Sequence, residues 1–505
     1  MEKLILNGDE LSLNDIYEVA YLNRDVEISD AAIDKVNKSR QVLFDLAAEG
    51  KGVYGLNRGV GWNKDKEFDK DFFETYNRNL LNTHSLGVGP YLSDEIVRAI
   101  LLIRLNKALM GYTGVSIDIL NHYRDFLNYR IHPLVPSRSS IGEGDITTLS
   151  HIGLCFIGEE DVRFNGKVVN SKDAMSKVGL KPVVLGPKDG LSIVSSNAQA
   201  EAMAFAIVKK VEELIKISNI IFCLSLEGLN GGIDPISEVV NSARQIKGQM
   251  KVAKDCREYL KGSYIYEPDP NRALQDPLSF RCAHAINGSV YDALEFVKEQ
   301  LVIAMNHTDD NPCIITEEGR TYVSANFENT SLAMGVEMLA IALSHLSKSS
   351  CYRMIKLADP AITGLTRFLT PKEVTTIAYG TIQKTFTMLD TQNRNMANPS
   401  SMDFYSLAGT IEDHASNLPL IAYKVEQMID NIYYILGIEA MHAVQAIDLR
   451  RIMIEGKENI QLGEVTQKAY KIIREEIPYY DKDRNISKDI KKAYELIKSN
   501  KLFEI

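Results

Sequence analysis

The chain has 505 residues, of which 45% are hydrophobic and 25% charged, and its formal net charge is −10. This composition is ordinary for a soluble globular protein and supplies enough apolar residues for a large core. The acidic balance, without a basic cluster, argues against a nucleic-acid partner, because binding phosphates requires concentrated Lys and Arg.

Six cysteines are scattered along the chain with no C-x-x-C pair. This distribution is typical of free thiols in a reducing compartment and argues against a disulfide framework or a zinc site. The chain opens into a polar start without a signal-peptide core, and no apolar run approaches the ~20 residues of a membrane span. We therefore expect a cytoplasmic protein with neither a metal nor a membrane partner.

The first 200 residues alternate short helical patterns with glycine-rich loops. These loops occupy residues 54–61, 87–89 and 142–144. Glycine at such density permits tight backbone paths around a site, although each loop alone is weak evidence. Residues 1–200 are therefore expected to form an N-terminal helical region that carries active-site loops.

From about residue 200 the sequence changes to long helical patterns, with apolar residues at three- and four-residue spacing. These patterns cover residues 202–228, 286–308, 331–357 and 420–451. Their length predicts a bundle of long central helices over 201–452, followed by a helical tail over 453–505. Residues 333–346 are apolar on more than one face, which favours an oligomer over a large monomeric all-α fold.

A set of short motifs follows in order almost from end to end of the chain. They are LILNG (4–8), NLLNTHSLGVG (79–89), LGPKDGL (185–191), QDP (275–277), SFRC (279–282), DNP (310–312), NF (326–327), EDH (412–414) and AIDLR (446–450). In this order and spacing they resemble the histidine and phenylalanine ammonia-lyases. The resemblance implies an all-α homotetramer with a long central helical bundle and active sites built from several subunits.

One loop departs from the family pattern at its chemical centre. In the family this loop contains Ala-Ser-Gly, which cyclises and dehydrates into an electrophilic methylidene-imidazolone, the only cofactor of those enzymes. Here the loop is one residue shorter and reads Gly142-Glu143-Gly144. Because a glutamate cannot lose water to give the exocyclic methylene, we expect the cofactor to be absent.

The positions that remove the β-proton and bind the carboxylate are retained. By the resemblance, Tyr54 is the base, and Arg281 grips the substrate carboxylate with its bidentate fork. A tyrosine with an ordinary pKa of ~10 is a poor base at neutral pH, so it needs a nearby cation, which Arg58 could supply. The structural alternatives are a Tyr54 that packs the glycine loop and an Arg281 that forms an ion pair.

Two retained positions concern the ring of the substrate. His84 and Glu412 resemble residues of the histidine-specific members, and both side chains can hydrogen-bond ring N–H groups that a phenyl ring lacks. They favour an imidazole-type substrate, unless both are polar residues satisfied inside the fold. Lys384 replaces a usual aliphatic residue and is either a group that stabilises charge on the ring or a solvated helix lysine.

Further departures gather around the amine-binding end of the site. They are Ser195 for the asparagine that steadies the electrophile, Leu278 for a tyrosine, Ala285 and Ile411 for glutamines, and Glu328 for a histidine. Random decay would scatter changes along the chain, so this grouping indicates altered chemistry. Asn197, Asn311 and Phe327 complete the predicted substrate-binding set, and Phe327, Tyr379 or Phe404 could add cation–π contacts.

A substrate with a quaternary nitrogen would make the electrophile unnecessary. Its nitrogen has no lone pair to attack the electrophile and leaves as neutral trimethylamine. The resemblance and the changed loop together predict a carbon–nitrogen lyase acting on an imidazole betaine. Ergothioneine, the trimethylbetaine of 2-thiohistidine, fits this description and would give thiourocanate, with Glu143 near the trimethylammonium. Alternatives are a solvated Glu143, a catalytically silent homologue, or a lyase or isomerase acting on another imidazole or aromatic amino acid.

Overall fold

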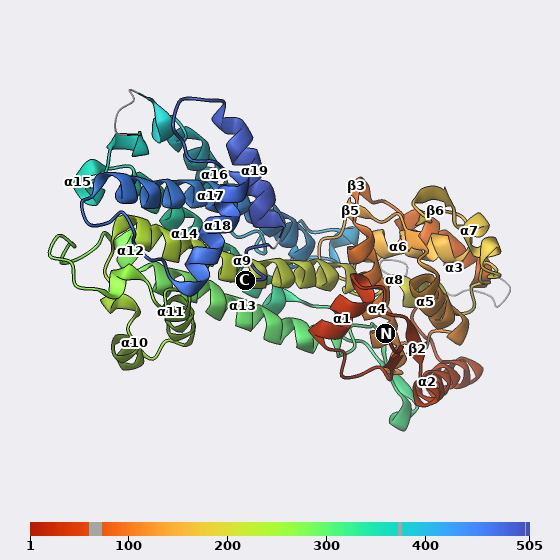
Figure 1. The fold of residues 1–505 in the computed structure, drawn as a ribbon. Coiled ribbons are helices and arrows are strands. Elements are labelled where there is room, and N and C mark those ends of the chain that lie inside the picture. Colours follow the sequence, from red (N-terminus) through yellow and green to blue (C-terminus); the bar gives the residue numbers. More distant parts are fainter. Residues whose placement is uncertain (60–72, 372–375, 404, 500) are drawn as a thin grey trace. The chain divides into compact units, whose positions relative to one another are not determined.

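A computed structural model describes residues 1–59, 73–371, 376–403, 405–499 and 501–505. The chain is 61% helix and 7% strand, which confirms the predicted all-α class (Figure 1). Its residues group into two compact units that interleave along the sequence. The first contains Met1–Ala206, Lys298–Val336 and Pro399–Tyr423, and the second Ile207–Val297, Glu337–Asn398 and Lys424–Ile505. The linear division at residues 200 and 452 remains a prediction.

The first unit is built around helix α4. Its helices are α1 (Leu13–Ala20), α2 (Asp30–Ala48), α3 (Phe73–His84), α4 (Asp94–Leu109), α5 (Ile117–Tyr129), α6 (Ile146–Phe156), α7 (Ser171–Lys177) and α8 (Asp189–Val194). Helix α4 begins after Ser93, whose hydroxyl caps it, and every residue from Val97 to Leu109 is buried. Helices α1, α2 and α5 pack against it, while α3, α6 and α8 pack on one another.

Short strands connect and close the loops of this unit. They are β1 (Leu4–Leu6), β2 (Val26–Ile28), β3 (Val88–Tyr91), β4 (His132–Pro133), β5 (Pro136–Arg138), β6 (Asp161–Phe164), β7 (Lys167–Asn170), β8 (Cys313–Ile315) and β9 (Arg320–Tyr322). Among the described strands, β1 and β2 pair in parallel, and the pairs β3–β5, β4–β6, β6–β7 and β8–β9 are antiparallel. With two or three short strands each, these sheets act as connectors.

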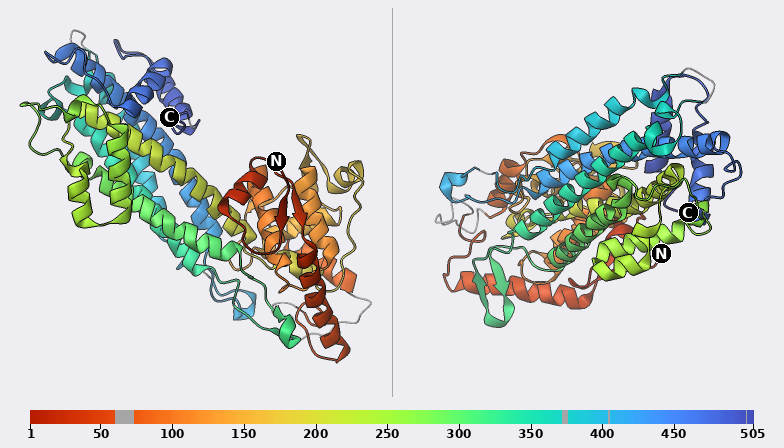
Figure 2. Two further views of the ribbon diagram at one scale, coloured as in Figure 1. Left: turned by 60° about the horizontal axis from the view of Figure 1, so that its bottom comes forward. Right: turned by 90° about the vertical axis from the view of Figure 1, so that its left-hand side faces the viewer.

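The four long helices appear close to the predicted positions. They are α9 (Ala198–Leu229), α13 (Ala283–Met305), α14 (Thr330–Leu357) and α17 (Leu418–Met453), and Figure 2 shows their second-unit portions alongside one another. Buried polar bonds join three of them: Glu439 on α17 accepts from Ser225 on α9 (2.8 Å) and pairs with Arg353 on α14 (2.5 Å). Shorter elements complete this unit, namely α10 (Glu238–Arg244), α11 (Lys247–Tyr259), α12 (Leu278–Arg281), α15 (Pro360–Thr363), α16 (Gln383–Met396), α18 (Glu464–Glu476) and α19 (Ile486–Lys498).

Two helical stretches are long and apolar enough, by length and composition, to cross a membrane: Asp189–Leu229 and Thr330–Leu357. No such stretch was expected from the sequence, because charged residues interrupt both of them. The most apolar window is entirely buried in the first and 61% buried in the second. A core helix has the same properties, so these stretches are weak evidence for a membrane.

Candidate active site

The loop that carries Glu143 is held on both sides of this residue. Before it, the Gly142 carbonyl accepts a hydrogen bond from the Ser416 hydroxyl (2.9 Å). After it, the Gly144 N–H donates to the side-chain oxygen of Asn197 (2.8 Å). Both glycines have positive φ angles, +81° and +62°. The position of Glu143 is therefore set by partners far away in the sequence.

Replacing Gly142 with alanine is expected to disrupt this loop. The new Cβ would clash with Ser416 Oγ and lie 3.0 Å from the Leu418 nitrogen, in addition to left-handed strain of about 1–2 kcal/mol. Gly166→Ala is the matched control, because φ is +72° there but nothing lies within 4 Å of the new Cβ. Thermal unfolding should show the larger shift for Gly142→Ala. Equal shifts for the two variants would mean that the loop accommodates the methyl group.

The described loop does not fit the family's cofactor. The methylidene-imidazolone is made from a serine flanked by alanine and glycine, and Glu143 occupies the place of the Ala-Ser pair. A glutamate side chain has no β-hydroxyl to eliminate. The residues of this loop therefore do not supply the precursor of the group.

An acidic cluster surrounds Glu143. Oxygen atoms of Glu143 and Glu328 and a ring nitrogen of His414 all lie within 4.8 Å of one another. Glu328 lies 3.0 Å from His414 Nε2 and accepts hydrogen bonds from the N–H (2.7 Å) and hydroxyl (2.5 Å) of Thr330. Metal ions can bind at such spacing, but Glu328 already has three donors around it, and we assign no metal to the cluster.

Glu143 holds its proton more tightly than an ordinary glutamate. Burial raises its pKa to about 7, helped by the charge of Glu328, a hydrogen bond to that carboxylate, and the charges of Glu412 and Asp413. Near neutral pH the Glu143 carboxyl is therefore partly protonated.

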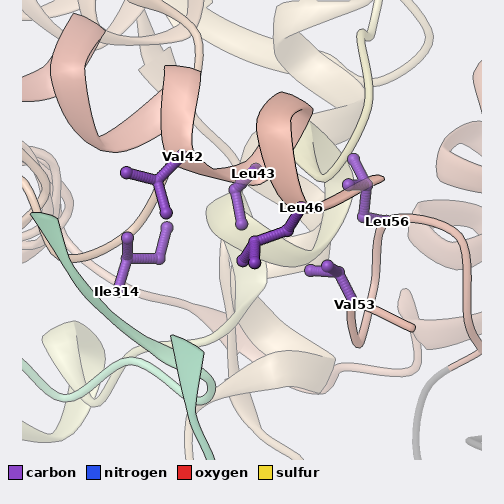
Figure 3. Close-up of a cluster of buried hydrophobic side chains, with 6 residues drawn as sticks. All are labelled: Val42, Leu43, Leu46, Val53, Leu56 and Ile314. Atoms are coloured by element: carbon purple, nitrogen blue, oxygen red, sulfur yellow. The ribbon is translucent and has the colours of Figure 1, made fainter. Parts of the chain in front are cut away.

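The proposed base, Tyr54, lies in a loop with a firm hydrophobic anchor. Val53 and Leu56, on either side of it, belong to a buried cluster with α2 and Ile314 (Figure 3). A tight turn brings Arg58 back toward Tyr54, since the Gly55 N–H donates to the Arg58 carbonyl (3.0 Å). Both side chains are half-buried. The turn pairs the main chains of Tyr54 and Arg58, and the effect of the arginine on the tyrosine remains a prediction.

The two predicted ring-binding residues present different groups. His84, the last residue of α3, is half-buried, and its Nδ1 lies 2.8 Å from the Leu80 carbonyl. A carbonyl only accepts, so Nδ1 carries the hydrogen of this bond, which leaves Nε2 as the candidate acceptor for a substrate. Glu412 is exposed, and main-chain bonds to Leu407 hold it in a narrow turn.

The remaining predicted residues of the first unit are mostly engaged with the main chain. Ser195 is 7% exposed at the end of α8. Asn311 accepts a hydrogen bond from the Ser324 N–H (3.0 Å), and the Phe327 carbonyl accepts from Asn197 (2.5 Å). The Phe327 side chain is half-buried. These hydrogen bonds hold Asn311 and the main chain of Phe327 in place. That the residues bind substrate remains a prediction.

Three predicted residues belong to the second unit. Arg281 ends α12, is half-buried and donates to the side chain of Gln275, and Lys384 is exposed near the start of α16. Tyr379 is only 1% exposed and packs on the rings of His442 and Tyr480 at centroid distances of 4.6 and 5.4 Å. It is a core residue, which argues against the cation–π role considered for it. Phe404 lies outside the described residues.

The pairing of Glu328 with His414 was not foreseen. In the sequence Glu328 is only a departure from the family pattern, and His414 is only the last residue of the EDH motif. The sequence offers only a partial signal for this pair, because Glu328 replaces a histidine of the family and His414 lies 86 positions later. Only the fold brings the two side chains together.

Comparisons with known proteins identify the family of the chain. The chain matches the family model "Aromatic amino acid lyase" over residues 11–475 and belongs to that family, as predicted. It is 32% identical to the histidine ammonia-lyase of Alkaliphilus oremlandii, over 100% of this chain and 98% of that protein. Among solved structures, histidine ammonia-lyase from Trypanosoma cruzi is 25% identical, with a TM-score of 0.88 over 99% and 94% of the chains.

A more similar structure is that of an ergothionase. The enzyme, from Treponema denticola, is described as degrading ergothioneine and was crystallised with desmethyl-ergothioneine sulfonic acid. It shares 70% identity with this chain and a TM-score of 0.97, with 100% of both chains covered.

Proposed function

We propose that this protein eliminates trimethylamine from ergothioneine to give thiourocanate, without a methylidene-imidazolone. The observation that carries the proposal is the 70% identity, over both whole chains, with an enzyme described as ergothionase. The chemistry of the loop supports it, because Glu143 stands where the family's electrophile is made. The wider similarity to histidine ammonia-lyases supports the same reaction class on an imidazole amino acid.

In the proposed reaction Tyr54, as the phenolate, removes the β-proton of the substrate. The electrons of that C–H bond form the Cα–Cβ double bond, while the Cα–N bond breaks and trimethylamine leaves with its electron pair. Arg281 binds the carboxylate, and Arg58 lowers the cost of forming the phenolate. No proton has to reach the leaving nitrogen, so no electrophile is needed to activate it.

In the proposed complex the imidazole ring of the substrate is bound by hydrogen-bond acceptors of the protein. His84 Nε2 accepts from one ring N–H, and the Glu412 carboxylate accepts from the other. Lys384 stabilises the negative charge that develops on the thione ring as the proton leaves. Ser195, Asn311 and Phe327 line the rest of the site in this proposal.

The trimethylammonium lies near Glu143 in the proposed complex. This group cannot donate a hydrogen bond, so it is recognised by charge and by contact area. Half-buried carboxylates suit that task, because a lower local dielectric strengthens their attraction for a cation. The Phe327 ring would add a cation–π contact.

The experiment is to mix the purified protein with ergothioneine and, separately, with histidine. Absorbance follows the conjugated acid, and an amine assay follows the released base. Thiourocanate and trimethylamine from ergothioneine, with histidine inert, are expected. Urocanate from histidine would overturn the cofactor-free proposal. Binding of ergothioneine without any product would instead support a catalytically silent homologue.

The oligomeric state and the cellular location are proposed from the same family resemblance. We expect a cytoplasmic homotetramer whose active sites combine residues of several subunits. The expected partner is a small imidazole betaine, with neither a nucleic acid nor a membrane. Light scattering of the purified protein would measure the mass of the assembly directly.

A further inference from the structure

Helix α12 has only four residues and ends at Arg281, the residue proposed to bind the substrate carboxylate. So short a helix makes few internal hydrogen bonds, and its position depends on its neighbours. Phe280 is one anchor, because it is 1% exposed. Arg281 itself is half-buried and donates to the exposed side chain of Gln275. Because exposed side chains change rotamer readily, the place of Arg281 depends on what holds α12.

Two donors from helix α14 converge on the main chain of α12. The Ser279 carbonyl accepts from the Ser349 hydroxyl (3.3 Å) and, at a longer distance, from Arg353 Nη1 (3.5 Å). Ser349 and Arg353 lie four residues apart, on one face of α14. They also bind each other, because Arg353 Nη1 donates to the Ser349 oxygen (3.0 Å). Since Ser279 precedes Arg281 by two residues, its carbonyl is a fixed point beside the proposed carboxylate contact.

Arg353 is held in turn by a buried carboxylate. Its Nε and Nη2 pair with the two oxygens of Glu439 (2.5 and 2.7 Å), and both residues are 0% exposed. Glu439 also accepts from the hydroxyls of Ser225 (2.8 Å) and Ser350. A bidentate pair fixes both the distance and the plane of the guanidinium, so the direction of Nη1 is fixed as well. Helices α9, α12, α14 and α17, all represented in the second unit, are thus joined through one ion pair.

We propose that Ser349 and Arg353 are positioning residues that set the place of Arg281 through the Ser279 carbonyl. This proposal rests on the proposed function, which assigns Arg281 to the substrate carboxylate. A bidentate contact between arginine and carboxylate needs two aligned hydrogen bonds at once, so a small shift of α12 weakens both of them. Ser349 and Arg353 act on the substrate only through α12, and no covalent bond changes.

A purely structural role for the same ion pair makes a different prediction. A buried guanidinium needs partners at all its nitrogens, and the bonds of Arg353 meet that need whatever α12 does. On that view, removing any hydroxyl from the network lowers stability and leaves the binding of carboxylates unaffected. On the positioning view, the hydroxyl that touches α12 also affects ligand binding, and only for ligands that carry a carboxylate.

The test is titration calorimetry with Ser349→Ala, in the Tyr54→Phe background that should bind ergothioneine without turnover. Ser349→Ala removes the shorter bond to Ser279 and keeps both bonds between Arg353 and Glu439. We expect Kd for ergothioneine to rise about three- to tenfold, the usual effect of one lost hydrogen bond. For ergothioneine amide, in which a neutral carboxamide replaces the carboxylate, the rise should stay below about twofold.

Ser350→Ala is the matched control. Ser350 is the next residue of α14 and is also buried, but its hydroxyl bonds to Glu439 and not to α12. This variant should lower the unfolding temperature about as much as Ser349→Ala, while Kd for ergothioneine changes by less than about twofold. An unchanged Kd in Ser349→Ala, equal rises in the two variants, or equal rises for ergothioneine and its amide would overturn the positioning role.

A measurement without ligand separates this proposal from the proposed function. Hydrogen–deuterium exchange of residues 278–286, followed by mass spectrometry, should be at least about threefold faster in Ser349→Ala than in the parent protein or in Ser350→Ala. Failure of the parent protein to bind ergothioneine would count against the proposed function, while the faster exchange would still support the hold on α12. Unchanged exchange in Ser349→Ala would overturn that hold.

Discussion

Replacing Tyr54 with phenylalanine should lower kcat for ergothioneine by about 10²–10⁴-fold, the usual contribution of a general base. KM should change by less than about threefold, because the ring still fills its place and only the proton acceptor is lost. The loop should stay in position, since Val53 and Leu56 remain in their buried cluster with α2.

Steady-state kinetics and single-turnover absorbance measure this effect. Tyr129→Phe is a suitable control, because Tyr129 ends α5 and is 45% exposed. Its kcat should match that of the parent protein. A Tyr54→Phe variant that turns over at the parent rate would mean that another group takes the proton.

Replacing Lys107 with methionine should lower the free energy of unfolding by about 3–5 kcal/mol. Its ammonium lies 2.6 Å from Glu201 and 2.7 Å from Asp309, and all three side chains are almost completely buried. The change leaves two buried carboxylates without their main cation. Because Asp309 holds the Asn197 N–H, activity should fall together with stability.

Denaturant unfolding, followed by circular dichroism, compares this variant with Lys251→Met. Lys251 pairs with Asp255 at 2.6 Å on α11, but its side chain is 49% exposed. An exposed helix pair contributes about 0.3–0.5 kcal/mol, so that variant should be nearly as stable as the parent. Similar losses in the two variants would show that burial of Lys107 does not raise its contribution.

The long helices could be predicted from the sequence because apolar residues recur along each of them at three- and four-residue spacing. The pattern over 331–357 became α14, Thr330–Leu357, and that over 420–451 became α17, Leu418–Met453. The interleaving of the two units could not be predicted. It depends on residues 298–336 and 399–423 packing with the first unit, and local periodicity carries no information about such contacts.

Some features of the candidate site could likewise be predicted from the sequence, and others depend on the fold. Tyr54, His84 and Glu143 could be proposed as site residues from the sequence because they lie within short motifs. The amide of Asn197 connects residues 53 and 130 positions away, and no local pattern reveals such bonds. The raised pKa of Glu143 has the same origin, because burial and Glu328 are both products of tertiary packing.

The two hydrogen bonds beside Glu143 also bear on whether this loop could cyclise. A five-membered imidazolone closed across residues 142–144 would join the nitrogen of Gly144 to the carbonyl carbon of Gly142. Here Asn197 binds that N–H and Ser416 binds that carbonyl oxygen, so each of the two reacting groups is tied to a separate partner. Replacing Glu143 with serine would supply a hydroxyl without freeing either group or lengthening the loop by the residue that the family has in addition. Cyclisation of this loop would therefore require changes at Asn197 and Ser416 as well as at Glu143.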